Sequence, residues 1–186
     1  MNLFGGYVGW LLAVAVVLIP TFVLGRFAQT KPPALRSDRH KSGFGGLMWL
    51  FLAGQVGWLL TLVWQTTYMT SELWFMLARS AQTMQAAFVA VVPGFVSIVI
   101  GVWVIWQLAA RRTPNAAAFE LVGVWLMGPC VSMLQSWYFN LALTEASLAQ
   151  LFGWSIFWSL YFALSPRTAL TYGTPRGRRI AEGLEK

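Results

Sequence analysis

Two polar residues lie inside long apolar stretches of this sequence, and they are the first candidates for chemistry. Glu120 is the one acidic residue within a stretch that could cross a membrane, and Gln55 lies near the middle of another such stretch. Ionisable groups are costly in hydrocarbon, so they are functional candidates where they occur. Glu120 is therefore a candidate proton or cation site. Gln55 is a candidate for bridging helices or contacting a solute.

A second interpretation of Glu120 is purely structural, and the sequence favours it. The residue lies about one turn from the expected start of its helix, within reach of Arg111, Arg112 or Arg167. A long side chain at such a position can extend toward the membrane surface and pair with a cation there. We therefore expect the Glu120 carboxylate to extend to the membrane surface and to pair with one of these arginines. A proton or cation site at Glu120 is the alternative.

The sequence contains no recognisable catalytic or metal-binding motif. The chain has one cysteine, Cys130, and one histidine, His40, which exclude an internal disulfide and a haem held by two intramembrane histidines. No nucleophile-and-base pattern, phosphate-binding loop or dinucleotide fingerprint occurs. We therefore expect no enzymatic activity, no metal and no cofactor.

Aromatic residues offer one further candidate site, in the last apolar stretch. Trp154 and Trp158 are one helical turn apart, and Tyr161 follows them closely. They could form an aromatic cleft for a lipid tail, a quinone or a pigment. Packing within a helical bundle or contact with lipid is the interpretation we favour.

The composition indicates that these residues belong to an integral membrane protein. Hydrophobic residues make up 58% of the 186 residues and charged residues only 10%, whereas soluble proteins have about 25% charged residues. Crossing a bilayer takes about 20 apolar residues in a helix. We predict an all-α, polytopic transmembrane bundle that forms a single domain over residues 1–186. Its five spans are expected at about 5–24, 47–64, 86–108, 116–137 and 148–164.

The basic residues predict how the five spans are oriented. Twelve of the thirteen lie in residues 25–46, in the connection that contains Arg111 and Arg112, or in residues 165–186. These segments would share one side of a five-span bundle, and loops rich in lysine and arginine stay in the cytoplasm. We therefore expect an N-terminus outside, a cytoplasmic basic loop at 25–46 and a cytoplasmic basic tail at 165–186. The partners expected at this face are anionic lipid headgroups rather than nucleic acid.

Two segments are less regular than the rest. Pro129, in "GPC", should kink the fourth span near its middle. Between the second and third spans, residues 71–84 have apolar residues partly on one face, which suits a short interfacial helix or an ordinary external loop. The sequence leaves both interpretations of residues 71–84 open.

A seven-residue sequence, "GYVGWLL" at 6–12 and "GQVGWLL" at 54–60, appears twice in nearly identical form without a wider duplication around it. We interpret the repeat as a shared requirement for close helix packing, because small residues spaced by one turn let helices approach closely in lipid. The small residues predicted to face other helices are Gly5, Gly9, Ala13, Ala53, Gly57, Ser97, Gly101, Ser155 and Ser159.

From about residue 43 to residue 173 the chain resembles a family of small bacterial membrane proteins, the domain of unknown function 2569 family. The resemblance is carried by "GFGGLMWLFLAGQ", by "VIWQLAARR" before a loop with proline, and by "IFWSLYFALSPRTALTY". It implies a multi-pass membrane protein of the bacterial inner membrane. The first helix is an addition to the usual four-span layout of the family, and the family offers no catalytic residue to carry over.

The function expected from these observations is non-enzymatic. We expect an accessory or structural subunit that packs against other membrane proteins, or against further copies of itself, through its small-residue faces. The alternative is a small transporter or a lipid- or quinone-binding protein that uses Glu120 and the deep aromatic residues.

Overall fold

The computed structural model describes residues 3–74 and 81–184, and these residues form helices joined by short connections. In chain order the helices are α1 (Leu3–Thr30), α2 (Leu47–Trp74), α3 (Ala81–Ala110), α4 (Pro114–Trp125), the π-helical turn η1 (Leu126–Cys130), α5 (Val131–Phe139), α6 (Glu145–Leu164), α7 (Pro166–Tyr172) and α8 (Pro175–Ala181).

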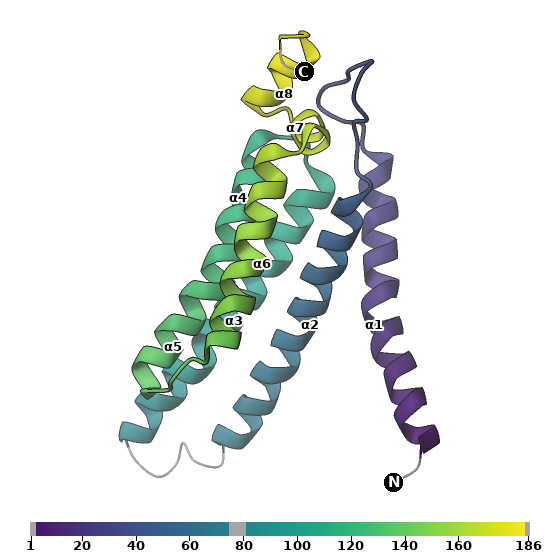
Figure 1. Cartoon of the computed structure of the whole chain (residues 1–186). Coiled ribbons are helices and arrows are strands. Elements are labelled where there is room, and N and C mark those ends of the chain that lie inside the picture. Colours follow the sequence, from purple (N-terminus) through teal and green to yellow (C-terminus); the bar gives the residue numbers. More distant parts are fainter. Residues whose placement is uncertain (1–2, 75–80, 185–186) are drawn as a thin grey trace.

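Five membrane-length rods run side by side along the molecule (Figure 1). They are α1, α2, α3, the continuous unit of α4, η1 and α5, and α6. Each is long and apolar enough to cross a membrane, which confirms the five predicted spans. The first helix begins at one end of the bundle, and α7 and α8 lie at the other (Figure 1). We call the end that contains α7, α8 and residues 31–46 the basic end.

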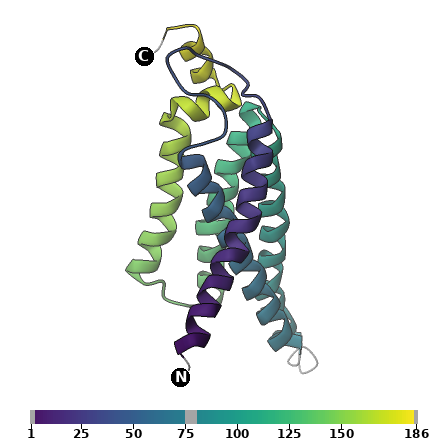
Figure 2. The same cartoon turned by 90° about the vertical axis from the view of Figure 1, so that its right-hand side faces the viewer.

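Small residues lie where three of the rods approach one another. A methyl group placed on Gly57 of α2 would lie 3.6 Å from a Val17 methyl of α1, and one on Gly101 of α3 would lie 3.1 Å from a Leu59 methyl of α2. Figure 2 shows α1 lying across α2 and α3. Ala13, in contrast, is exposed and makes no such approach within the chain.

The remaining small residues divide between contacts within the chain and positions that are not described. Ser97 and Ser155 are buried, Ala53 is half-buried, and Ser159 accepts a hydrogen bond of 3.0 Å from the indole nitrogen of Trp125 across α4 and α6. The surroundings of Gly5 and Gly9 lie outside the described part of the structure.

The proline of the fourth span sits in a π-helical turn rather than in an ordinary kink. Pro129 has no N–H to donate, and around it the helix widens so that the N–H of Val131 donates to the carbonyl of Leu126, five residues back. Single π turns of this kind are rare and often occur at functional sites. This turn lies beside the pocket described below.

Residues 71–84 do not form a separate interfacial helix where the structure describes them. Residues 71–74 continue α2 and residues 81–84 begin α3, while residues 75–80 lie outside the described ranges. The hydroxyl groups of Thr70 and Ser71 donate to the carbonyls of Thr66 and Tyr68 on the same helix. The helix α2 continues through this polar sequence to Trp74.

The basic tail predicted at 165–186 folds into two short helices with matching starts. Ser165 and Thr174 each cap a helix by accepting a hydrogen bond from a backbone N–H three residues later, and each is followed by proline. Gly173 joins the helices with a left-handed backbone, φ +64°. At Gly177, any side chain would collide with the backbone carbonyl of Ala169, so the two helices pack in direct backbone contact.

Residues 31–46 are docked on α7 by hydrogen bonds from distant parts of the chain. The amides of Ala34 and Leu35 donate to the carbonyls of Thr171 and Leu170, at 3.1 and 3.0 Å. Arg167 donates from Nε to the carbonyl of Gly43 at 3.1 Å. The predicted loop thus begins six residues later than expected, at residue 31, because α1 continues to Thr30, and the loop is held by hydrogen bonds to α7.

The sequence "GFGG" explains how the arginine fits there. A methyl group on Gly45 would lie 2.7 Å from Nη2 of Arg167, and one on Gly46 would lie 2.9 Å from Nη1. Gly46 also has a positive φ of +62°. The glycines therefore leave the space that the Arg167 guanidinium occupies.

Arg112 closes the basic end by joining two helix ends. Its Nη1 donates to the carbonyl of Leu108 at 2.8 Å, and its Nη2 donates to the carbonyl of Ala28. Both carbonyls belong to the last turn of their helices, where backbone acceptors lack helical partners and a positive charge is favourable. The guanidinium also lies over the rings of Phe44 and Tyr172, at 5.9 and 5.5 Å.

Candidate functional site

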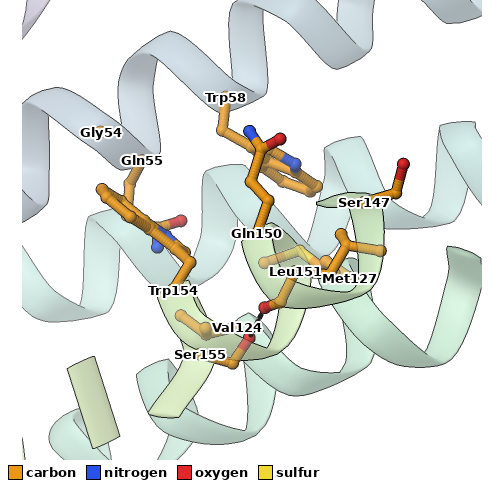
Figure 3. Close-up of a pocket in the computed structure, with 11 residues that line it drawn as sticks. Gly54, Gln55, Trp58, Val124, Met127, Ser147, Gln150, Leu151, Trp154 and Ser155 are labelled. Carbon is orange, nitrogen blue, oxygen red and sulfur yellow. Dashed lines mark hydrogen bonds between the residues drawn. The ribbon is translucent and has the colours of Figure 1, made fainter. Parts of the chain in front are cut away.

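A pocket of about 470 Å³ lies between α2, the α4–η1 unit and α6. Figure 3 shows side chains from these elements reaching into one space. The lining residues are Gly54, Gln55, Trp58, Val124, Met127, Gly128, Ser147, Gln150, Leu151, Trp154 and Ser155. They come from the middle of α2, from the middle of the fourth span and from the first half of α6, so the pocket lies at the level of the membrane-length rods.

Helical periodicity explains why these residues share a wall. The α6 residues of the lining lie at positions i, i+3, i+4, i+7 and i+8, which is one face of a helix. The residues contributed by α2 and by the fourth span have the same spacing. Of the lining residues, Gln55, Trp154 and Ser155 are candidates that the sequence itself offers. The spacing was visible in the sequence, but nothing there indicated which three faces meet.

Gln55 places an unbonded amide at this pocket. Its side chain is buried, with 4% of its surface exposed, and it makes no hydrogen bond within the described residues. Ser155 lies across from it and donates its hydroxyl hydrogen to the carbonyl of Leu151 at 3.1 Å, which leaves its oxygen free to accept. An amide that both donates and accepts is the kind of group that orients a ligand in an apolar pocket. The alternative prediction, that Gln55 bridges helices, finds no bonded partner.

Trp154 lies against the backbone of α2. A methyl group on Gly54 would lie 2.6 Å from the Trp154 ring, so only glycine leaves room for the indole at this position. The rest of the ring is accessible, with 42% of the residue exposed. Trp154 therefore forms part of the pocket wall and part of its rim.

Of the three residues expected to form an aromatic cleft, only Trp154 lines the pocket. Trp158 is fully buried and packs against Phe51, with ring centroids 4.6 Å apart, and against Tyr161 at 5.5 Å. Neither Trp158 nor Tyr161 lines the pocket. Trp158 belongs to the bundle core, and Tyr161 is partly buried against it.

Glu120 does not extend to a surface, so the favoured sequence interpretation is wrong. The residue is 0% exposed, and neither carboxyl oxygen has a hydrogen-bond partner in the described residues. Arg112 and Arg167, two of the expected partners, bond to backbone carbonyls instead. The cause lies outside the span: α7 folds back over the end of the bundle and packs against α4, so the carboxyl group is covered.

Tyr172 of α7 lies at the centre of the covering contacts. Its hydroxyl donates to the carbonyl of Leu108 at 3.0 Å. Burial raises the pKa of this hydroxyl well above its usual value, and the guanidinium of Arg112 lowers it. Burial lowers the pKa of Arg112. The Arg112 guanidinium lies 5.5 Å from the centre of the Tyr172 ring, so the two side chains cover this end of the bundle together.

The pocket is lined by groups that can hold a bound molecule. Residues 3–74 and 81–184 contain no group of three His, Cys, Asp or Glu residues placed to hold a metal ion. Cys130 is exposed and has no disulfide partner. The pocket supplies apolar walls, aromatic rings, an amide and a hydroxyl, which are groups that hold a molecule in place.

No family model, curated protein or solved structure matches this chain. The resemblance to the domain of unknown function 2569 family stays a prediction.

Proposed function

We propose that this protein binds an amphipathic molecule dissolved in the membrane, of the lipid or quinone class, in the pocket between α2, α4–η1 and α6. The observation that supports the proposal most directly is the buried, unbonded amide of Gln55 within apolar and aromatic walls. Pockets for small molecules are commonly 300–1,000 Å³ in volume, mostly apolar, and equipped with a few polar groups. A volume of about 470 Å³ falls within that range.

The position of the pocket favours a ligand that arrives from the hydrocarbon. Trp154 and Gln150, which are exposed, form its accessible rim at mid-span of the bundle. In a bilayer this rim faces acyl chains rather than water, so a ligand with an apolar chain can enter from the side. Its head would carry a hydrogen-bonding oxygen such as a carbonyl, hydroxyl or carboxyl group, which the amide of Gln55 can bind.

The second hypothesis is that the protein is an accessory subunit of a larger membrane complex, and the structure supports this hypothesis less. The small residues at Gly57 and Gly101 serve contacts between helices of the same chain. Ser97 and Ser155 are buried there as well. These faces are occupied, so they are not available for a partner protein.

We further propose that the basic end is cytoplasmic and that the protein resides in a bacterial inner membrane. The connections and helices at this end carry eleven of the described basic residues, whereas Glu72 and Glu145 lie at the opposite end. Such an asymmetry is what positive-inside orientation requires. A single cysteine at Ser37, in a Cys130→Ala background, should then react with an impermeant thiol reagent only after the cytoplasmic side is opened.

The binding proposal is tested with a photoreactive fatty acid that carries a diazirine in its chain, added to the full protein in lipid nanodiscs. We expect cross-links at the pocket residues of α2 and α6, mapped by mass spectrometry. Gly128→Leu should reduce them at least tenfold. Only Ser155 Oγ lies within 4 Å of a methyl group at residue 128, at 3.8 Å, so the larger side chain has room to extend into the pocket.

Gly153→Leu is the matched control, since Gly153 is exposed on α6 and a methyl group there meets nothing within 4 Å. Its cross-links at the pocket should equal those of the parent protein. Equal labelling in the Gly128→Leu variant, or labelling spread evenly over exposed residues such as Phe157 and Leu160, would contradict the proposal.

A further inference from the structure

Three fully buried polar side chains lack hydrogen-bond partners near the basic end. They are Glu120 of α4, Trp158 of α6 and Thr168 of α7, each with 0% of its surface exposed. Both carboxyl oxygens, the indole Nε1 and the threonine hydroxyl are unbonded within the described residues. We call these three residues the Glu120 layer. Buried polar groups are nearly always bonded, so three exceptions on mutually packed helices require an explanation.

The Glu120 layer lies directly behind the pocket. Glu120 is one turn before Val124 on α4, and Trp158 is one turn after Trp154 on α6, where Val124 and Trp154 both line the pocket. One helical turn is about 5.4 Å. Phe51, one turn before Gln55 on α2, packs on Trp158 with ring centroids 4.6 Å apart. Three helices thus place the layer between the pocket and the basic end.

The charged and titratable groups that face Glu120 are few. Arg112 precedes α4, Tyr161 is on α6, and Tyr172 is on α7. The hydroxyl of Tyr172 and the guanidinium of Arg112 both bond to the carbonyl of Leu108. Helix α3, which also packs against α4, contains no titratable residue. No cation is therefore bonded to the carboxyl group in the described structure.

A carboxylate in such surroundings would be very costly, because an isolated buried charge loses its hydration without compensation. A neutral carboxylic acid has no such cost, and it both donates and accepts hydrogen bonds. We propose that Glu120 is a proton-binding site, occupied by a proton in the described conformation. The proton exchanges with water: the O–H bond of the acid breaks, and the electron pair stays on the carboxylate.

The other two residues of the Glu120 layer, Trp158 and Thr168, could stabilise the ionised form of Glu120. The Trp158 N–H and the Thr168 O–H are donors, and two such hydrogen bonds stabilise a carboxylate. They belong to α6 and α7, so bonding to Glu120 after proton release requires these helices to shift against α4. Release of the proton is thereby linked to the position of Trp158, which packs against the pocket residue Trp154 with ring centroids 5.4 Å apart.

Infrared spectroscopy of the full chain in nanodiscs tests this site without any ligand. At neutral pH we expect the carbonyl stretching band of a protonated carboxylic acid, with complete loss of the band in Glu120→Gln. Glu145→Gln, a change at an exposed glutamate, should keep it. At alkaline pH the band of the parent protein should disappear together with a change in tryptophan fluorescence, and the Gln variant should show neither change.

Labelling the parent protein with carboxyl-¹³C glutamate gives a second measurement that needs no variant. The band should shift to lower frequency, which assigns it to a glutamate even if Glu120→Gln does not fold. Absence of a protonated-acid band at neutral pH, or its persistence in Glu120→Gln, would overturn the proposal. Because no fatty acid is added, failure here is distinct from failure of the binding proposal.

Discussion

The two halves of the bundle are stabilised in different ways. At the basic end, hydrogen bonds join segments far apart in the sequence: Arg112 to the ends of α1 and α3, and Arg167 to Gly43. In the half that holds the pocket, the walls are apolar, and the amide of Gln55 has no partner. The difference indicates a fixed end that positions the helices and a more open half that can admit a molecule between them.

The largest effect should come from breaking the backbone contact between α7 and α8. Gly177→Ala introduces a methyl group that collides with the carbonyl of Ala169. Overpacking of this kind commonly costs about 1–3 kcal/mol, and a rigid backbone neighbour places this variant near the upper value. Thermal unfolding in detergent measures the loss. Gly153→Ala is the control, and an equal midpoint for the two variants would show that the basic end is not tightly packed.

A smaller but still large effect should follow from removing the guanidinium that joins α1 and α3. Arg112→Met keeps the length of the side chain but leaves the carbonyls of Ala28 and Leu108 without this donor. We expect a loss of about 2 kcal/mol in the free energy of unfolding. Arg111→Met, at the exposed neighbouring position, should change it by less than about 0.5 kcal/mol. Similar losses in both variants would mean that positive charge alone matters at this end.

Substitutions in the half of the bundle that holds the pocket should lower the free energy of unfolding less than those at the basic end. Gly54→Ala tests this expectation. The added methyl group requires the Trp154 ring to move, but that ring is partly exposed and has space available. We expect a loss of about 1 kcal/mol and altered quenching of tryptophan fluorescence by lipid-borne quenchers. In a Trp154→Leu background the same change should cost less, as a double-mutant cycle would show. A loss as large as that of Gly177→Ala would remove the contrast between the halves.

Tyr172→Phe should have an effect at neutral pH no larger than that of Gly54→Ala, since it removes one hydrogen bond to Leu108 and costs about 1 kcal/mol. Its pH dependence is more informative. Burial raises the pKa of Tyr172, so the unfolded chain ionises first, near its ordinary value of about 10. Stability is therefore fully present below that pH and falls as the pH rises above it. The Phe variant should lose this part of the alkaline decline, whereas Tyr68→Phe, at an exposed tyrosine, should retain it.

Much of the fold follows from local properties of the sequence. The five spans follow from hydropathy, and close contacts at Gly57 and Gly101 follow from small residues at helical spacing. The irregularity at Pro129 follows from its missing N–H. Each of these features depends on residues that are neighbours along one helix.

The features that the sequence did not predict depend on contacts between distant segments. Glu120 looked accessible because it lies near a helix end, and only the folding of α7 over that end buries it. The pocket required three helix faces to be assigned to one another, which spacing along each helix cannot do. Residues 71–84 were expected to form a separate interfacial helix or a loop because their apolar residues lie partly on one face, whereas residues 71–74 continue α2 and the hydroxyl of Ser71 donates to the carbonyl of Tyr68 on that helix.

The π turn gives the fourth span two registers. It holds one residue more than an α-helical turn, and each residue of an α-helix is rotated by about 100° from the one before. If the turn closed into a regular α-helix without losing a residue, α5 would swing by that angle, and Gln135, whose amide donates to the carbonyl of Ala90 on α3, would face a different neighbour. Deleting one residue from the turn would instead let the helix continue as a regular α-helix with α5 in about its present orientation. A deletion of one residue should thus disturb the packing of α5 less at this position than elsewhere in the span.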